Sequence, residues 1–303
     1  MKPRLARRWP RCHAAKCKFL FQILIFLFLS QFWTLLKYLE APWFYTQSIS
    51  SKLGQSFPDK SSAVSLFLQR FVTSKLWNTH HAIGNVKKGC QQTLKDLGTS
   101  FLDLYLIHWP VHFKYEGLDV LTPKNSDGTV AIDTSVNIVD TWKEMEKLVD
   151  EGLVKDIGVS NFTIAHLETI LKSCRIKPAV NQVELHPYLP QQALLDFCTK
   201  NGIHMTAYSP LGSGKEGGPL SNETIAKIAQ AHSATPAQIL LSWAIQRGTS
   251  VIPKSVNPSR IAENFKTITL SESDMKEIAK LGEKKKRFID PYAFWNIDIF
   301  GEK

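Results

Sequence analysis

Residues 102–110 read Leu-Asp-Leu-Tyr-Leu-Ile-His-Trp-Pro, a run of strand-forming side chains that presents a histidine and stops at a proline. A parallel strand buried on both faces has such a nearly continuous apolar sequence, and chemistry on parallel strands gathers at their carboxyl ends. We therefore expect a buried strand over residues 102–107 with His108 at its functional end. Upstream, the run 71–74 ends beside Lys75 in the same way. One such residue alone is often structural, but two in successive units favour a site.

Six strand-like runs follow one another from residue 71 onward, each succeeded by a segment of helical character. We expect strands at residues 71–74, 102–107, 156–159, 179–183, 204–208 and 250–252. Alternating strands and helices predict parallel pairing with right-handed crossovers. Six units fit both an open doubly wound sheet and a (β/α)8 barrel, and periodicity alone does not separate these two α/β folds.

The helical segments have recognisable faces and starts. Ser221-Asn-Glu-Thr-Ile resembles a capped first turn, and Pro236 stands where a first helical position is expected. Apolar side chains recur at three- and four-residue spacings along one predicted helix face, at Ile83, Val86, Cys90, Leu94 and Leu97.

A glycine-rich phosphate loop is missing from the sequence. No Gly-x-Gly-x-x-Gly follows a first strand, and the glycine-rich run 211–218 lacks the earlier glycine and the following Ser or Thr of a P-loop. We interpret that run as a flexible loop. A nucleotide would then be held by strand ends and helix N-termini, which disfavours the doubly wound fold.

Composition excludes several classes of protein. With 303 residues, 44% of them hydrophobic, the chain can bury a large core. The net charge is 37 − 27 = +10, but residues 1–18 hold seven Lys and Arg and no acid, so 10 − 7 = +3 remains for the rest. A nucleic-acid partner is therefore not expected. The five cysteines form no Cys-x-x-Cys pair and, since the last three fall in predicted helices, are interpreted as reduced thiols.

Residues 19–36 form an uncharged, strongly apolar stretch behind the basic N-terminal flank. As a helix this stretch would be about 27 Å long, close to a membrane span. A membrane anchor is one interpretation, although the basic flank would then place the whole body across the membrane. A buried strand over residues 23–29, or a segment that does not fold with the rest, are the alternatives.

A series of ordered motifs resembles the aldo-keto reductases. The motifs lie at residues 71–77 (FVTSKLW), 102–110 (LDLYLIHWP), 158–162 (GVSNF), 181–188 (NQVELHPY), 207–212 (AYSPLG), 252–255 (IPKS) and 260–264 (RIAEN). The tail 287–301 resembles those of fungal members that act on glyceraldehyde, glycerol or sugar-derived carbonyls. The resemblance covers residues 71–303. It implies a TIM (β/α)8 barrel that binds NADPH across its strand ends and reduces aldehydes or ketones, as a cytoplasmic monomer acting on a small carbonyl substrate.

The chemistry of carbonyl reduction explains two of the motif residues. It needs a hydride for the carbon and a proton for the oxygen, on which negative charge develops. In similar enzymes a tyrosine gives the proton, a lysine lowers the pKa of that tyrosine, an aspartate pairs with the lysine, and a histidine orients the carbonyl. The resemblance assigns the lysine to Lys75 and the histidine to His108. It also places Trp77 and Trp109 along an apolar substrate pocket, with ordinary packing as the alternative.

The same resemblance implies the cofactor contacts. It assigns Ser160, Asn161 and Gln182 to the carboxamide, Tyr208 to the nicotinamide ring, Ser209, Leu211 and Ser213 to the pyrophosphate, Lys254, Ser255 and Arg260 to the 2′-phosphate, and Glu263 and Asn264 to the adenine. Two cations and a hydroxyl at one phosphate favour NADPH over NADH. No metal is expected, because His108 and His112 do not share a helical face.

The chain departs from the family before residue 71. The family's run resembling G-Y-R-x-I-D-T-A-x-x-Y-x-N-E, which carries the aspartate and the tyrosine, has no counterpart. We therefore divide the chain into an atypical segment, residues 1–70, and an oxidoreductase domain, residues 71–303. Glu40 and Tyr45 have the right mutual spacing, which makes Tyr45 a hypothetical general acid on spacing alone.

Three interpretations follow from this departure. The chain is an NADPH-dependent reductase, a catalytically impaired nucleotide-binding protein with a regulatory or interaction role, or a membrane-anchored variant whose site faces a lumen. Glycosylation at residues 222–224 (Asn-Glu-Thr) would select the third. The basic run 284–287 is interpreted as a solvated charge run that follows a helix.

Overall fold

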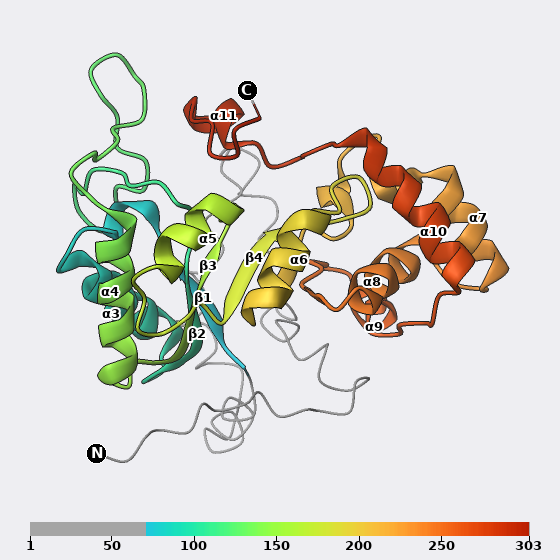
Figure 1. The fold of residues 1–303 in the computed structure, drawn as a ribbon, viewed down its shortest axis with the longest axis horizontal. Coiled ribbons are helices and arrows are strands. Elements are labelled where there is room, and N and C mark those ends of the chain that lie inside the picture. The colour runs from blue at the N-terminus through green and yellow to red at the C-terminus, as the bar shows by residue number, and fades with distance from the viewer. Residues whose placement is uncertain (1–70, 303) are drawn as a thin grey trace.

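Six parallel strands form the centre of the protein, for which a computed structural model describes residues 71–302 (Figure 1). The strands are β1 (Thr73–Leu76), β2 (Leu102–Ile107), β3 (Val154–Ser160), β4 (Val180–Glu184), β5 (His204–Tyr208) and β6 (Ser250–Val251). The helices are α3 (Asn85–Leu97), α4 (Ile138–Asp150), α5 (Ile164–Leu171), α6 (Gln192–Asn201), α7 (Glu223–Ala231), α8 (Pro236–Gln246), α9 (Pro258–Asn264), α10 (Glu272–Lys280) and α11 (Pro291–Trp295). The predicted anchor 19–36, Glu40 and Tyr45 lie outside the described residues.

The order of the strands decides between the two predicted folds. Each strand pairs in parallel with the next one along the chain, from β1 to β6. A doubly wound sheet reverses its order at a switch point, whereas a barrel adds strands in sequence. The strands therefore have the arrangement of a TIM barrel, and the prediction of six β/α units is confirmed. Within residues 71–302, β1 and β6 each have one neighbouring strand.

The apolar run that suggested a buried strand is β2, and all six of its residues are buried. Its one charged residue is Asp103, whose carboxylate accepts hydrogen bonds from the Val72 amide at 2.8 Å and from Lys155 Nζ at 2.7 Å. A buried carboxylate is tolerated when it is paired in this way. Asp103 thus bonds β2 to β3 and to the residue that precedes β1.

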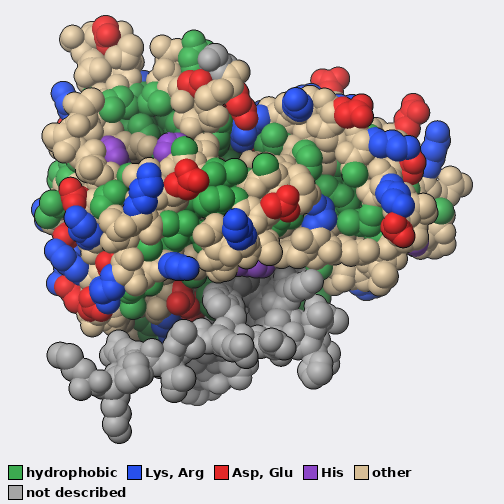
Figure 2. Space-filling model, viewed as in Figure 1, with side chains coloured by type: hydrophobic (Ala, Val, Ile, Leu, Met, Phe, Trp, Pro, Cys, Tyr) green, Lys and Arg blue, Asp and Glu red, His purple; other side chains and the backbone are tan. Residues whose placement is uncertain are grey.

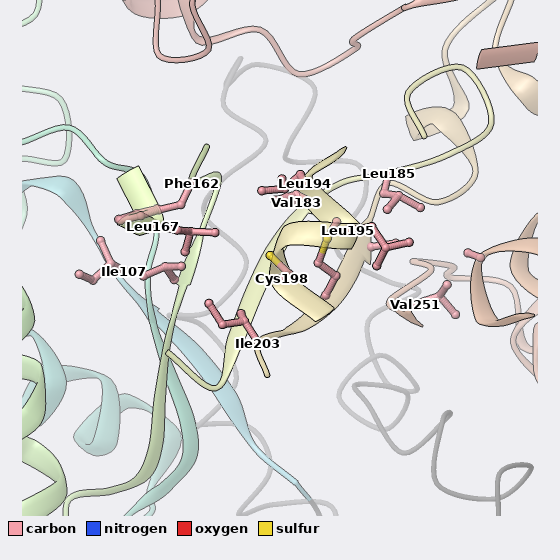
Figure 3. Packing of buried hydrophobic residues seen from close by; sticks show 14 of the residues in the cluster. Ile107, Phe162, Leu167, Val183, Leu185, Leu194, Leu195, Cys198, Ile203 and Val251 are labelled. Atoms are coloured by element: carbon pink, nitrogen blue, oxygen red, sulfur yellow. The ribbon is translucent and has the colours of Figure 1, made fainter. Parts of the chain in front are cut away.

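The helices pack their apolar faces on this sheet. In α3, Val86, Cys90 and Leu94 are buried as predicted, but Ile83 is 71% exposed. The prediction for Ile83 is wrong because Gly84, in the left-handed region at φ 81°, caps the helix after it. Figure 3 shows the corresponding packing of α6, whose side chains include Leu194, Leu195 and Cys198.

Two predicted helix starts are confirmed. Asn222 caps α7, with its side-chain oxygen accepting from the amides of Thr224 and Ile225. Pro236 is the first residue of α8, which follows a capping box formed by Thr235 and Gln238. Both caps satisfy amides that have no partner inside the helix.

The cysteines of the described residues are free thiols. Cys90 and Cys198 are buried in α3 and α6, as predicted. Cys174 is only partly buried and follows α5, so its predicted helical position is wrong.

The surface charge is mixed. On the face shown in Figure 2, Lys and Arg side chains alternate with Asp and Glu. Within the basic run, Lys284 Nζ lies 4.2 Å from the centre of the Tyr188 ring, and the Arg287 guanidinium lies 3.6 Å from that of Phe300. Arg287 also bonds to Glu302 and its side chain is only 8% exposed, so the interpretation of this run as solvated is wrong for Arg287. Among the helices described, none is both long and apolar enough to span a bilayer.

Gly158 marks the tightest approach inside the sheet. A Cβ placed there would lie 2.6 Å from the Val180 carbonyl oxygen and 2.8 Å from a methyl carbon of Leu106. We expect Gly158→Ala to destabilise the fold by about 1–3 kcal/mol, the range for overpacked cores, because backbone of β4 blocks the methyl group. Urea unfolding followed by circular dichroism measures this. An unchanged midpoint would contradict the packing described.

Candidate active site

One cavity of about 190 Å³ lies at the carboxyl ends of the strands. Each strand contributes to it from its last residues or from the residue that follows. The lining consists of Lys75, His108, Trp109, Ser160, Asn161, Gln182, Tyr208, Ser209, Ile252 and Ile289. Eight of these ten were predicted as site residues. The cavity therefore joins side chains that are far apart in the sequence.

Two of the lining residues were missed by the sequence analysis. Ile252 follows β6 directly, so its position at a strand end was a usable signal. Ile289 belongs to the C-terminal tail, and no local pattern indicates where a tail folds back.

Asn161 holds three strand ends together. Its Nδ2 donates to the His108 carbonyl at 2.9 Å, and its Oδ1 accepts from the Tyr208 hydroxyl at 2.8 Å. Its backbone has φ 65°, a left-handed conformation that asparagine adopts more readily than most residues. Ser160 Oγ donates to the Gln182 carbonyl at 2.8 Å beside it. The ends of β2, β3, β4 and β5 are thereby fixed around the cavity.

Gln182 presents an unused acceptor at this place. Its Oε1 is buried, and no donor among the described residues reaches it. Buried polar atoms are normally paired, so an orphaned acceptor beside a cavity indicates a site for a donor from a bound molecule. An amide group of a ligand would satisfy it.

The cavity holds a lysine and a histidine whose pKa values are shifted by burial. Burial lowers the pKa of Lys75 to about 8, and no charged partner within residues 71–302 contributes to this shift. Burial, then Lys75, then His81 hold the pKa of His108 well below 6.5. At neutral pH, Lys75 is therefore mostly cationic and His108 is neutral. A cation and a neutral imidazole together suit an oxygen on which negative charge develops.

Tyr208 is a neutral phenol at the same pH. Burial, followed by the charge of Glu184, raises its pKa well above 10. Its hydroxyl is committed to Asn161. Tyr208 is therefore suited to contact a ring with its face.

Aromatic side chains surround the histidine. The ring centre of Trp77 lies 5.1 Å from that of His108, and Trp109 stacks on His108 at 6.1 Å. Trp295 of the tail contacts Trp77 at 6.1 Å and Trp109 at 5.4 Å. Trp109 lines the cavity, whereas Trp77 lies behind it in this aromatic cluster.

The remaining predicted cofactor residues lie outside the cavity lining. Leu211 and Ser213 lie in the loop after β5, where the hydroxyl of Ser213 donates to that of Ser209 at 2.7 Å. Lys254, Ser255, Arg260, Glu263 and Asn264 lie after Ile252, in the segment that leads into α9 and in α9 itself. Lys254 and Arg260 are exposed and Asn264 is buried. The structure thus puts them on segments that leave the cavity.

A pair of hydrogen-bonded histidines lies near the site. The Nδ1 atoms of His81 and His112 are 2.8 Å apart, so one ring donates and the other accepts. Burial lowers the pKa of His112 to about 4 and holds that of His81 well below 6.5. Within the described part of the chain, no group of three or more His, Cys, Asp or Glu side chains could hold a metal ion.

The histidine pair predicts a dependence of stability on pH. In the unfolded chain each histidine binds a proton near pH 6.5, but folded His112 does so only near pH 4. Stability is therefore present above pH 6.5 and is lost as the pH falls toward 4, by up to about 1.4 kcal/mol per pH unit for each proton. His112→Asn should reduce this slope, as measured by urea unfolding between pH 7 and 5. Identical slopes in both proteins would contradict the assignment.

Comparisons with known proteins agree with this arrangement. The profile of the Aldo/keto reductase family matches residues 63–283. The chain is 46% identical to D/L-glyceraldehyde reductase of Hypocrea jecorina over 242 residues, 76% of this chain and 72% of that protein. It is 43% identical to NAD(P)H-dependent D-xylose reductase of Pachysolen tannophilus over 246 residues, 76% and 77% of the two chains.

A solved structure extends the likeness to three dimensions. The aldose reductase of Giardia lamblia superposes with a TM-score of 0.75 at 41% identity, covering 82% of this chain and 83% of that one. The predicted resemblance to the aldo-keto reductases is confirmed, and fungal proteins are among the relatives. With its ordered strands, its strand-end cavity and these relatives, the chain belongs to the aldo/keto reductase family.

Proposed function

We propose that the chain reduces aldehydes or ketones to alcohols with NADPH. The observation that carries the proposal is the cavity in which Lys75 and His108 stand together at the ends of neighbouring strands. A carbonyl oxygen placed between them would meet a cation and a neutral imidazole. These are the groups that stabilise negative charge on oxygen during hydride addition.

The residues present fit a nicotinamide cofactor. The orphaned Gln182 Oε1 can accept from a carboxamide, next to Ser160 and Asn161. Tyr208 offers a ring face and a hydroxyl that is already committed. We assign Ser209, Leu211 and Ser213 to the pyrophosphate. When bound, the cofactor supplies the hydride.

The phosphate-binding residues support the choice of NADPH. We assign Lys254, Ser255 and Arg260 to the 2′-phosphate, with Glu263 and Asn264 near the adenine. Asn257 caps α9 through a bond from the Arg260 amide at 3.2 Å, which fixes the start of that helix. Two cations beside a phosphate favour NADPH over NADH.

The chain's own residues divide the work on the substrate. Neutral His108 donates an N–H to the carbonyl oxygen and orients it. The Lys75 ammonium stabilises the charge on that oxygen and, at a pKa of about 8, is itself matched to proton donation near neutral pH. Trp109 and Ile289, with Trp77 behind them, exclude water from the reacting carbon.

The identity of the general acid stays a prediction. Tyr45 lies outside the described residues, and its assignment rests on its spacing from Glu40. Turnover that is unchanged in Tyr45→Phe would eliminate it and leave Lys75 as the proton donor of the cavity.

A second function has an observation in its favour. The sequence has no counterpart of the family's run with the aspartate and the tyrosine, and within residues 71–302 burial alone shifts the pKa of Lys75, with no charged partner. A protein that binds nucleotide without turning over a carbonyl is the alternative. NADPH consumption with glyceraldehyde and with nitrobenzaldehyde separates the two functions. Consumption supports the reductase, and NADPH binding without consumption supports the alternative.

We assign the protein to the cytoplasm as a monomer, by its resemblance to the family. The predicted glycosylation test for a lumenal form meets a physical obstacle. Asn222 caps α7 with its oxygen, and its Nδ2 donates to the Tyr188 hydroxyl at 3.1 Å. A glycan on Nδ2 would disturb both contacts.

A further inference from the structure

A buried carboxylate at the end of β4 holds the C-terminal tail. Glu184 is fully buried, and its Oε1 accepts from the Phe288 amide at 2.7 Å while its Oε2 accepts from the Ile289 amide at 2.9 Å. His186 Nε2 lies 2.9 Å from the same Oε1 and is equally buried. The carboxylate is thus shared between two tail amides and an imidazole. Such charge-assisted bonds are strong and directional.

The tail that Glu184 holds forms one wall of the cavity. Figure 1 shows the chain passing from α10 to α11 over the top of the view. Ile289, whose amide bonds to Glu184, lines the cavity directly. Six residues later, Trp295 contacts Trp77, Trp109 and Phe113, with ring centres 5.1 to 6.1 Å apart.

The position of this wall depends on the Phe288 and Ile289 amides, because their bonds to Glu184 join the tail to the end of β4. The Lys286 amide donates to the Tyr188 carbonyl at 3.0 Å just before them, and the His186 ring packs on Phe288 at 5.1 Å. The bond between Arg287 and Glu302, by contrast, joins two parts of the tail to each other. Loss of the carboxylate would leave two amides and an imidazole without their acceptor, which favours displacement of the tail.

We propose that Glu184 is a positioning residue that fixes residues 286–300 as the substrate-pocket wall and so sets the preference for bulky aromatic over small aldehydes. This inference rests on the proposed reductase function. A bulky aldehyde would reach Ile289 and Trp109, on which Trp295 packs, as well as Lys75 and His108, whereas a small one needs only the last two. Displacing the wall therefore weakens the transition state of the bulky substrate selectively.

Glu184→Gln tests the proposal with little change of volume. The glutamine side chain has one oxygen that can accept a hydrogen bond. Its NH2 group is a donor and would face one of the two backbone N–H donors, so one bond to the tail is lost. We expect the ratio of kcat/KM for nitrobenzaldehyde to that for glyceraldehyde to fall about tenfold, the size of one lost charge-assisted bond. Glu302→Gln makes the same change on the tail surface and should leave the ratio unchanged. If Glu184 only stabilised the fold, both substrates would lose activity by the same factor, and that result would overturn the proposal.

Two further measurements complete the test. Because Glu184 is paired in register with Tyr208, the Kd of NADPH is measured as well and should change less than about threefold. Hydrogen exchange of the Phe288 and Ile289 amides reports the anchoring without any turnover. We expect these amides to exchange slowly in the wild type and at least about tenfold faster in Glu184→Gln, but not in Glu302→Gln.

The outcomes separate the two proposals. A wild type that consumes NADPH with neither aldehyde ends the reductase proposal, while hydrogen exchange still decides whether Glu184 anchors the tail. If Glu184→Gln fails to fold, hydrogen exchange of the Phe288 and Ile289 amides in the wild type tests whether Glu184 anchors the tail. Fast exchange of both amides in the wild type would overturn the role of Glu184, and slow exchange supports it.

Discussion

Replacement of Lys75 by methionine is expected to lower kcat/KM for glyceraldehyde by about 10²–10⁴-fold, the usual contribution of a positioned acid–base group. Methionine has a similar length but no charge, so the oxygen that gains negative charge loses its cation. NADPH affinity should change little, because the proposed place of Lys75 is beside the substrate carbonyl. Steady-state consumption of NADPH measures the rate, and Lys280→Met, on the exposed surface of α10, is the control.

The pH profile of the wild type tests the same residue. Burial lowers the pKa of Lys75 to about 8, and the proposed role of Lys75 needs the protonated form. The value of kcat/KM should therefore be highest below pH 8 and fall as the pH rises through it. Full activity in Lys75→Met, or a profile that stays level to pH 9.5, about 1.5 units above this pKa, would contradict the role of Lys75.

The second large effect is expected at the proposed 2′-phosphate site. Lys254→Met combined with Arg260→Met should raise the Kd of NADPH by about 10²-fold or more, because each charge-assisted bond contributes about 1.5–3 kcal/mol. The Kd of NADH, which has no 2′-phosphate, should stay within about twofold. Fluorescence titration with both nucleotides gives the two constants.

A matched control and a salt series make this result specific. Lys276→Met removes an exposed cation from α10, a different helix from the α9 that carries Arg260, and should not change the Kd of either nucleotide. NADPH binding to the wild type should weaken with salt more steeply than binding to the double variant, because exposed charges are screened. An equal loss of NADPH and NADH affinity would show that Lys254 and Arg260 do not bind the 2′-phosphate.

The extent to which the sequence predicted the structure differs between its elements. The strand β2 was predicted to the residue because burial on both faces leaves a nearly continuous apolar run, closed by His108 and Pro110. Strand ends indicated Lys75 and His108 in the same way, whereas the other six of the eight cavity residues named were assigned by the resemblance to the family. Periodicity alone left the barrel and the doubly wound sheet open. The resemblance implied the barrel, and the strand order, which depends on pairing between distant segments, agrees with it.

Other features were beyond local sequence patterns. Ile289 joins the cavity through bonds to a residue 105 positions earlier, and no periodicity encodes such a separation. Ile83 continues the apolar spacing of α3 but precedes Gly84, the capping glycine. The spacing therefore predicted the buried face of the helix correctly but wrongly included Ile83. The lowered pKa of Lys75 depends on burial by surrounding elements, which composition does not reveal.

Transfer of deuterium from the nicotinamide to a product tests the central claim most directly. Wild-type protein is incubated with glyceraldehyde and NADPH that carries deuterium at C4 of its nicotinamide, and the product is analysed by mass spectrometry. The proposed function predicts an alcohol with one deuterium on the former carbonyl carbon, formed at least about 10²-fold more slowly by Lys75→Met than by the wild type. Tight binding of the labelled nucleotide with no deuterated alcohol would contradict it and leave a nucleotide-binding protein.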